Sequence, residues 1–432
     1  MTSQNRRPTM KDKQAKYPQL RFKGFTDPWE EHKLGEITEY IKGFAFKSKD
    51  YKKSGYRIIR VSDLGKESIK NSNDSIFTSE EIAIQQKKYK IKQDEIIITT
   101  VGSKAEMKES AVGRPIIISE SLGYLLNQNL VKIYGKENYS NYFIYSQLLQ
   151  PRYSDYISMI QRGNANQANI AINDLWKFQI LIPEIEEQQK IGSFFKQLDH
   201  LITLHQRKLD LLKEQKKGYL QKMFPKNGAK VPELRFAGFA DAWEQRNIKE
   251  ISKVFIGLVT SMTENYRDNG TLLIRNSDIK SGHFEFSKDP IYLDEVFAEK
   301  NASRRLKIGD VITVHTGDIG TSAVVGKREE GSIGFATINT RPDKSVLDSD
   351  YLSTYFNTTV HKHWAIKMST GDGRSNYNLY DFNRLIVPLP NIEEQQKIGS
   401  FFKQLDNLIT LHQRKLEKLQ ELKKGYLQKM FV

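Results

Sequence analysis

The side chains in this sequence with the clearest chemical use are hydrogen-bond donors suited to phosphate groups and to the edges of bases. Arg can make two hydrogen bonds to guanine, Asn and Gln can do the same with adenine, and Lys mainly neutralises phosphate. Such residues recur through both halves of the chain and gather in two loops, 162–169 and 371–376. We expect the following residues to bind DNA: Lys47, Lys49, Arg57, Arg60, Lys104, Asn164, Gln167, Asn169, Arg275, Asn276, Arg304, Arg305, Arg374, Ser375 and Asn376.

The two loops occupy equivalent places in an internally repeated chain. Segments 185–224 and 392–431 each span 40 residues, of which 35 match, and they are separated by an offset of 392 − 185 = 207. With this offset Gln167 corresponds to Arg374, and Asn169 corresponds to Asn376. Matched loops with different side chains would read two different half-sites, whereas any single Lys is more often only a solvated surface charge.

No catalytic motif is recognisable in the sequence. Residues 320–327, GTSAVVGK, have one residue too many between the glycines for a phosphate-binding loop. The nucleotide-binding G-x-G-x-x-G, the zinc-binding H-E-x-x-H and the G-x-S-x-G of hydrolases are missing, as is the Asn- or Asp-Pro-Pro-aromatic segment of amino-methyltransferases. His205 and His412 are best explained as polar helix residues, and His315 as a structural residue at a strand end, with a role in a site as the alternative.

Composition narrows the class of protein further. The 432 residues carry a net charge of +15, which favours a polyanionic partner and most often nucleic acid. The chain has 0 Cys, which excludes thiol catalysis and Cys-ligated metal and suits the reducing cytoplasm; we expect no metal site. No apolar run is long enough to cross a membrane, and the polar, basic start does not resemble a secretory signal.

A second repeat shows how the chain is organised. Segment 18–37, PQLRFKGFTDPWEEHKLGEI, matches segment 232–251, PELRFAGFADAWEQRNIKEI. The order is therefore domain, helix, domain, helix. The expected parts are a basic tail at 1–17, a first domain at 18–184, a helix and linker at 185–227, a second domain at 228–391 and a second helix at 392–432.

The repeated segments 185–224 and 392–431 predict two long helices. Their apolar positions recur at steps of four and three, which is the 3.5-residue period of a coiled coil. An antiparallel pair with a pseudo-twofold axis is favoured, because the second domain then sits at one end of the pair. A second apolar row could bind partner subunits, although packing of the helices against their own domains alone is equally compatible with the periodicity. This row contains Leu201, Leu204, Leu211, Leu408, Leu411 and Leu422.

Each domain is expected to be of the mixed α+β class. β-Branched content and punctuation by Gly or charge predict strands at 56–64, 95–101, 112–119, 130–134, 272–276, 310–315, 323–326 and 385–389. Short helices rich in aromatic residues are expected at 139–150 and 350–357.

The chain resembles the specificity (S) subunit of Type I restriction–modification enzymes. The resemblance rests on the repeated R-F-x-G-F-x-x-x-W-E openings, the P-x-I-E-E-Q-Q-K-I helix starts at 183–191 and 390–398, and the order of domains and helices. Loop 163–170 also resembles the Gly-x-x-Gln-x-Asn loop of that family. The second copy departs from this pattern, with Arg374 in place of Gln.

The resemblance implies a DNA-binding, non-catalytic subunit. Each domain would be a target recognition domain that reads one half of an asymmetric, bipartite site in double-stranded DNA, and the helices would set the gap. Two methylation (M) subunits would dock on the chain, and restriction (R) subunits would add cleavage. S-adenosylmethionine, ATP and magnesium would then belong to those partners, with no cofactor in this chain. A self-sufficient methyltransferase or nuclease and a coiled-coil scaffold are the alternatives.

Overall fold

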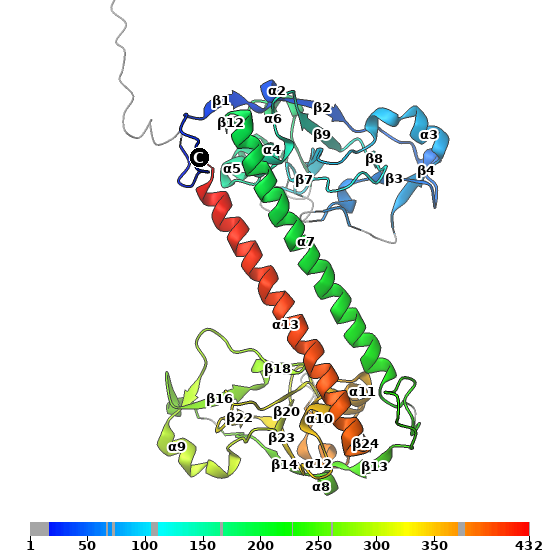
Figure 1. Cartoon of the computed structure of the whole chain (residues 1–432), viewed down its shortest axis with the longest axis vertical. Helices are drawn as coiled ribbons and strands as arrows, with labels where there is room; N and C mark the ends of the chain where they lie inside the picture. The colour runs from blue at the N-terminus through cyan, green and yellow to red at the C-terminus, as the bar shows by residue number, and fades with distance from the viewer. Residues whose placement is uncertain are drawn as a thin grey trace, which may run out of the picture. The chain divides into compact units, whose positions relative to one another are not determined.

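The computed structural model describes residues 17–65, 68–70, 74–104, 111–164, 167–226, 228–260, 262–369 and 376–431. The chain forms two compact units, and Figure 1 labels many of the helices and strands of both. Unit 1 contains the residues up to Leu204 and those from Leu416 onward, and unit 2 contains the residues from His205 to Lys415. Each long helix therefore contributes one part to each unit. The expected contact residues Arg374 and Ser375 lie outside the described residues.

Unit 1 is built around a four-stranded antiparallel sheet of order β2-β9-β5-β7 and a smaller sheet of order β4-β3-β8, in which β8 runs parallel to β3. Their strands are β2 (Thr38–Lys42), β3 (Tyr56–Ile59), β4 (Ile76–Thr78), β5 (Ile96–Thr99), β7 (Pro115–Ile117), β8 (Leu125–Leu126) and β9 (Leu130–Gly135). A two-stranded sheet pairs β1 (Glu30–Lys33) with β12 (Gln179–Ile182). The helices of the domain are α2 (Leu34–Ile37), α3 (Glu80–Gln85), α4 (Asn141–Leu148), α5 (Pro151–Ile160) and α6 (Ile172–Leu175).

Unit 2 repeats this architecture with its own strands. Its sheets have the orders β14-β23-β20-β21 and β15-β19-β16-β22, with β22 parallel to β16, and β13 pairs with β24. The strands are β13 (Glu244–Asn247), β14 (Ser252–Ile256), β15 (Tyr266–Arg267), β16 (Thr271–Arg275), β17 (Ile279–Lys280), β18 (His283–Phe284), β19 (Tyr292–Leu293), β20 (Val311–Val314), β21 (Ser322–Val324), β22 (Ile333–Phe335), β23 (Thr337–Pro342) and β24 (Ile386–Leu389). The helices are α8 (Ile248–Ile251), α9 (Glu295–Lys300), α10 (Ser349–Phe356), α11 (Thr359–Met368) and α12 (Leu379–Phe382).

Both faces of the central sheet are buried in unit 1. Successive side chains of a strand point to opposite faces, so Ile96 and Ile98 enter the large core with α4, while Ile97 enters a second cluster with Ile116 and Leu126. This explains why 96–99 reads as a continuous apolar run instead of an alternating one. The mixed α+β class expected from the sequence is confirmed.

The expected strands exist, but several are shorter than the apolar runs that predicted them. Segment 56–64 is β3 followed by a 3-10 turn at Val61–Asp63, and segment 272–276 is β16 followed by the matching turn at Asn276–Asp278. In each turn the Asp carboxylate accepts from the backbone N–H three residues earlier, at Arg60 or Arg275, and this hydrogen bond stops the strand.

The two long helices match the expectation closely. Helix α7 (Ile185–Lys222) and helix α13 (Ile392–Lys429) are each 38 residues long, which corresponds to about 57 Å of helix. The apolar residues that recur along the helices at steps of four and three are buried or half-buried. Phe195 and Phe402, for example, are each 1% exposed. A Cβ at Gly192 would lie 2.8 Å from Ser140 Oγ and 3.2 Å from the backbone N of Phe143, so this close approach of α7 to α4 favours Gly.

Within each unit the two helices contact each other in antiparallel directions. In unit 1 the Lys423 ammonium forms an ion pair with the Asp199 carboxylate at 2.6 Å, and Tyr426 packs edge-on against Phe194. In unit 2 the corresponding contacts are Lys216 to Asp406 at 2.5 Å and Tyr219 against Phe401. In unit 1, for example, the step forward from Phe194 to Asp199 on α7 is matched by a step backward from Tyr426 to Lys423 on α13.

A buried ion pair fastens each domain opening to the start of a helix. In unit 1 the Arg21 guanidinium donates two hydrogen bonds of 2.7 Å to the Glu187 carboxylate, which is fully buried in the first turn of α7. In unit 2 Arg235 does the same to Glu394 in α13, at 2.7 and 2.8 Å. The hydrogen bonds to Glu187 raise the pKa of Arg21, since they favour its charged form.

The repeated Trp of each opening completes the attachment. Trp29 is fully buried among Phe143 and Phe431, and Trp243 is 1% exposed beside Phe224 and Tyr351. The backbone N–H of Leu20 also donates to the carbonyl of Lys429 at the end of α13. The aromatic opening is therefore core and domain–helix packing and not a base-stacking surface, as its unchanged repetition predicted.

Removing one partner of the buried pair should destabilise one unit selectively. Arg21→Met leaves the buried Glu187 carboxylate without a counter-charge, and we expect a loss of about 3–5 kcal/mol in unit 1. Hydrogen exchange measured by mass spectrometry should show lost protection in the start of α7, with unit 2 unchanged. The double variant Arg21→Met/Glu187→Leu should regain most of it, and equal protection in wild type and Arg21→Met would contradict this account.

A buried histidine makes unit 2 sensitive to acid. His361, the third residue of α11, is fully buried, with Nδ1 at 2.8 Å from the carbonyl of Phe356. Burial lowers the pKa of His361 to about 4. The third residue of α5 in unit 1 is instead Tyr153, whose hydroxyl donates to the carbonyl of Gly113. Only His361 titrates between pH 4 and 7 at this position of the fold.

The sign of the pH dependence follows from the lowered pKa. Between about pH 6.5 and 4 the unfolded state binds a proton at His361 that the folded state does not bind, so stability falls as the pH falls. We expect unit 2 to lose about 2 kcal/mol from pH 7 to pH 5 through this group. Hydrogen exchange of α11, corrected for intrinsic rates, measures the loss. His361→Gln keeps a donor without titration and should flatten this profile, and an unchanged profile in that variant would refute the assignment.

Candidate nucleic-acid interface

The amide-rich loop of the first domain is a hairpin on a small sheet. Strand β10 (Arg162–Gly163) pairs with β11 (Ala168–Asn169), and β11 pairs with β6 (Val101–Gly102). Gly163 has φ of 107°, and a Cβ there would lie 2.3 Å from the carbonyl of Gln167, so the turn requires Gly. The hairpin presents the side chains of Asn164, Gln167 and Asn169 to solvent.

Asn164 has a second role inside this hairpin. Its Oδ1 accepts a hydrogen bond of 2.9 Å from the backbone N–H of Gln167, which fixes the loop from within. Its amide nitrogen remains on the exposed surface. Gln167 and Asn169 are thus the side chains that the hairpin holds outward as donors and acceptors.

The second domain has the same arrangement at the equivalent place. The N–H of Ile170 donates to the carbonyl of Thr100 at 3.0 Å, and the N–H of Tyr377 donates to the carbonyl of His315 at 3.0 Å. Thr316 forms a bridge with Asn376, as Val101 pairs with Asn169. The offset of 207 that aligns the loops in sequence therefore also aligns Asn169 and Ile170 with Asn376 and Tyr377 in the fold.

Several expected contact residues have structural roles in the first domain. Arg57 is 5% exposed, lies 3.6 Å from Asp63 and donates to the carbonyl of Lys70 at 2.5 Å. Arg60 donates to Asp63 and to the carbonyl of Asp74. The spacing R-x-x-D, repeated at Arg275 and Asp278, was the signal in the sequence for this turn-closing use.

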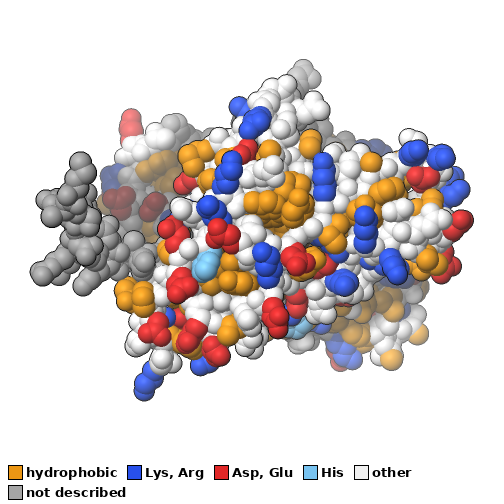
Figure 2. Space-filling model, turned by 90° about the horizontal axis from the view of Figure 1, so that it is seen from above, with side chains coloured by type: hydrophobic (Ala, Val, Ile, Leu, Met, Phe, Trp, Pro, Cys, Tyr) orange, Lys and Arg blue, Asp and Glu red, His pale blue; other side chains and the backbone are white. Residues whose placement is uncertain are grey.

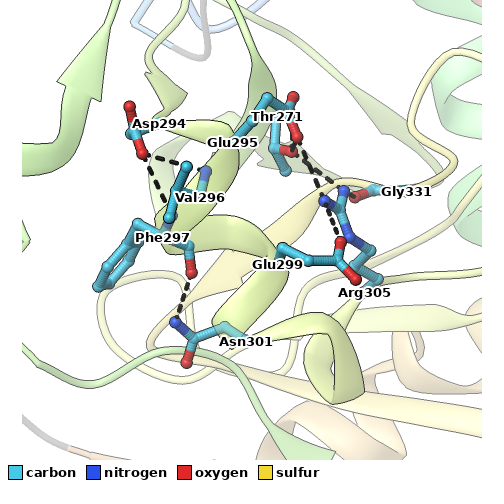
Figure 3. Close-up of polar contacts among 9 residues, drawn as sticks. All are labelled: Thr271, Asp294, Glu295, Val296, Phe297, Glu299, Asn301, Arg305 and Gly331. Atoms are coloured by element: carbon cyan, nitrogen blue, oxygen red, sulfur yellow. Dashed lines mark hydrogen bonds and ion pairs between the residues drawn. The ribbon is translucent and has the colours of Figure 1, made fainter.

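The arginines of the second domain are also engaged. Arg304 donates to the carbonyls of Ile256 and Gly257. Figure 3 shows the Arg305 guanidinium beside the Thr271 hydroxyl and the carboxylates of Glu295 and Glu299. The pair Arg305–Glu295 is separated by 3.3 Å at the edge of a hollow of about 350 Å³. The guanidinium groups of Arg304 and Arg305 are therefore already engaged within the domain.

The expected lysines differ from the arginines in exposure. Lys47 and Lys49 are exposed around the 3-10 turn Ser48–Asp50, and Lys104 is half-buried just after β6. On the face seen in Figure 2, Lys and Arg side chains are scattered, with acidic side chains among them. The net charge of +15 thus does not form one basic stripe on this face, and it supports general attraction to phosphate more than recognition.

Sequence reasoning did not connect the residues of the second domain that the fold brings together. Asn276 accepts from the backbone N–H of His315 at 3.0 Å, and its amide donates to the carbonyl of Ala336. His315 contacts Thr316, and Thr316 contacts Asn376. Asn276 is therefore internally bonded at both ends of its amide, while Asn376 remains exposed. No local pattern could reveal this, because the contacts join residues 39 and 60 positions apart.

The leucines of the second apolar row of the helices are exposed. Each of its six leucines exposes between 41% and 51% of its surface, namely Leu201, Leu204, Leu211, Leu408, Leu411 and Leu422. Leu201 and Leu408 are equivalent under the offset of 207, as are Leu204 and Leu411. Exposed apolar side chains in the same positions of both repeats mark a surface suited to protein contact.

Among the described residues, no group of three or more His, Cys, Asp and Glu side chains is placed to hold a metal ion. In that same part of the chain, none of the helices combines the length and the apolar character that a bilayer crossing requires.

The chain matches the family model of the Type I restriction modification DNA specificity domain twice, over residues 26–214 and 240–421. The chain therefore belongs to this family. The two matches fall on the two halves of the internal repeat.

Individual relatives span almost the whole chain. It is 22% identical over 420 residues to the Type I restriction enzyme MjaVIII specificity subunit of Methanocaldococcus jannaschii, covering 92% of this chain and 91% of the relative. It is 23% identical to the Type I restriction enzyme EcoBI specificity subunit of Escherichia coli, covering 88% and 79%. The crystal structure of the Type I restriction–modification S subunit from M. genitalium has the same fold, with a TM-score of 0.67, 14% identity, and 96% and 99% coverage.

The internal hydrogen bond of the hairpin gives a direct test of its geometry. Asn164→Ala removes the acceptor for the Gln167 N–H, and we expect exchange of that amide to accelerate about 2- to 12-fold, the value of one net hydrogen bond. Asn164→Asp keeps the acceptor and should exchange like wild type. The measurement is amide exchange followed by NMR, and equal rates in all three proteins would show that the loop is held otherwise.

Proposed function

We propose that this chain is the DNA-sequence-recognition subunit of a Type I restriction–modification complex, and that it is not itself an enzyme. The proposal is carried by one observation: two family matches on equivalent folds carry loops at equivalent places whose sequences differ, with Gln167 in one and Arg374 in the other. Domains 18–184 and 228–391 would each read one half of an asymmetric, bipartite site in double-stranded DNA. Gln167 and Asn169 are the proposed readers of the first domain, with Arg374, Ser375 and Asn376 in the second.

We infer that α7 and α13 form an antiparallel coiled coil with a pseudo-twofold axis. The contacts support this. Lys216 of α7 corresponds to Lys423 of α13, and Asp199 of α7 corresponds to Asp406 of α13, each at the offset of 207. The ion pair Lys216–Asp406 therefore has its counterpart in Lys423–Asp199. Each contact of one unit thus has its counterpart, with the helices exchanged, in the other.

A residue that contacts the equivalent residue of the other repeat lies next to such an axis. His205 Nδ1 is 2.9 Å from His412 Nδ1, and the two positions differ by 207. Burial, reinforced by the neighbouring His205, lowers the pKa of His412, which favours the neutral form of His412. The pair supports the polar, register-setting role expected for these residues.

The helices would set the gap between the half-sites and dock two methylation subunits. Leu201, Leu204, Leu408 and Leu411 of the second apolar row support this, because the internal repeat places these four exposed leucines at equivalent positions of the two helices. Restriction subunits would join through the methylation subunits. Adenine methylation with S-adenosylmethionine, and ATP- and magnesium-dependent cleavage, would then belong to these partners.

The gap offers the sharpest test of the proposal. Inserting four residues, about one helical turn, in one long helix should change the length of the unspecified gap in the methylated site. The readout is a methylome of cells that express the chain with its cognate partners. The same four residues inserted after Pro225, outside the helix, should leave the gap unchanged.

Other outcomes would reject the proposal. Methylation of an unaltered gap by the helix variant would remove the helices from the control of spacing. Methylation or cleavage by the purified chain alone would identify a self-sufficient enzyme, and DNA affinity that is independent of salt would indicate a scaffold.

A further inference from the structure

A chain of hydrogen bonds in unit 2 leads from half-buried residues to an exposed amide. The Asn276 side chain donates to the carbonyl of Ala336 at 3.1 Å and accepts from the His315 N–H at 3.0 Å. His315 Nδ1 lies 2.8 Å from Thr316 Oγ1, and Thr316 Oγ1 donates to Asn376 Oδ1 at 2.8 Å. One end of the chain is the carbonyl of Ala336, the residue after β22, and the other end is the side chain of Asn376.

The direction of this chain follows from the number of protons available. The Thr316 hydroxyl has one hydrogen, which it donates to Asn376, so it must accept from His315. His315 therefore carries its proton on Nδ1. Burial lowers the pKa of His315, which keeps the ring neutral at pH 7 with one N–H only.

This arrangement leaves Asn376 with a defined pattern of free groups. One lone pair of Oδ1 accepts from Thr316, while the second lone pair and the Nδ2 hydrogens are left on an exposed side chain. An adenine edge offers the complementary N6 donor and N7 acceptor, and Asn binds both at once. The hydrogen bond from Thr316 also fixes which end of the amide points which way.

The first domain has no such chain at the equivalent place. Position 101 is Val, which cannot donate to Asn169, and the hydroxyl of Thr100 donates to the carbonyl of Asn129 at 2.9 Å. Position 61, which corresponds to Asn276, is also Val. Both domains therefore have the exposed Asn. In the second domain its side-chain oxygen accepts a hydrogen bond from Thr316, whereas Val101, the residue opposite Asn169 in the first domain, has no hydroxyl to donate.

We propose that His315 and Thr316 are positioning residues that lock Asn376 to read an adenine in the half-site of the second domain. The proposal rests on the function proposed above and names one base class within it. Asn276 supports the same chain from its half-buried end and does not itself contact DNA.

The test uses the whole chain assembled with its cognate partner subunits. Binding is measured to DNA duplexes that vary one base pair at a time in each half-site. Thr316→Val is the key variant because Val101 shows that the fold accepts Val at this position. We expect it to reduce discrimination at one adenine about 2- to 12-fold, and Asn376→Ala to reduce it about 5- to 160-fold at the same base pair.

The controls separate positioning from a general loss of structure. Thr316→Ser restores the hydroxyl and should restore discrimination. In the Asn376→Ala background, Thr316→Val should have no further effect, because its action passes through the amide. Thermal unfolding of each variant, and NMR of the His315 ring nitrogens showing a protonated Nδ1, complete the set.

Distinct results overturn the inference. Equal weakening on all sequences would make Asn376 a backbone contact, and unchanged discrimination in Thr316→Val would remove the positioning role. A protonated Nε2 with a bare Nδ1, or selection of a base other than adenine, would also refute it. If the wild-type complex shows no selectivity in either half-site, it is the proposed function that fails.

Discussion

The structure depends on one repeated interaction, the buried Arg–Glu pair between each domain opening and a helix start. Arg21 and Arg235 approach carboxylates that are completely withdrawn from solvent in the first turns of α7 and α13. A buried carboxylate is costly without its partner, so this contact fixes where a domain can attach. Two hydrogen bonds from a planar guanidinium also fix the orientation, which a single Lys could not do.

The contacts of the long helices explain why segments 185–224 and 392–431 are so similar in sequence. Residues of α7 must serve at once as the partner of their own domain and as the partner of the other helix. Asp199 and Lys423, for example, are held in one unit by the same contact that joins Asp406 and Lys216 in the other. A change in one copy alone would break a contact in one unit without repairing it in the other. The recognition loops are free of this constraint and have diverged.

The sequence was most informative where a single period governs a long element. The two 38-residue helices could be predicted almost to the residue, since each turn repeats the same choice between apolar and polar side chains. Strands were found but overextended, because an apolar run does not reveal where a side-chain carboxylate will stop it. The Asp63 and Asp278 turns show this directly.

Candidate contact residues were harder to predict because residue type does not reveal prior engagement. Arg57, Arg60, Arg275, Arg304 and Arg305 were selected as donors, yet the fold already uses their guanidinium groups. The amide residues Asn164, Gln167 and Asn169 of the first hairpin, in contrast, are exposed. An Arg within reach of Asp at i+3 should thus be weighed first as a turn-closing residue.

The two domains also differ in the half-buried residues that pair with the exposed Asn of each loop. The exposed Asn169 and Asn376 are the same residue, while their supports, Val101 and Thr316, differ. A fold that keeps its outer residue but changes the residue beneath it alters the rigidity of that contact without altering its chemistry. Because base discrimination depends on how firmly a donor and acceptor are held, two domains with similar loops can still differ in selectivity. Comparison of exposed residues alone would miss this difference.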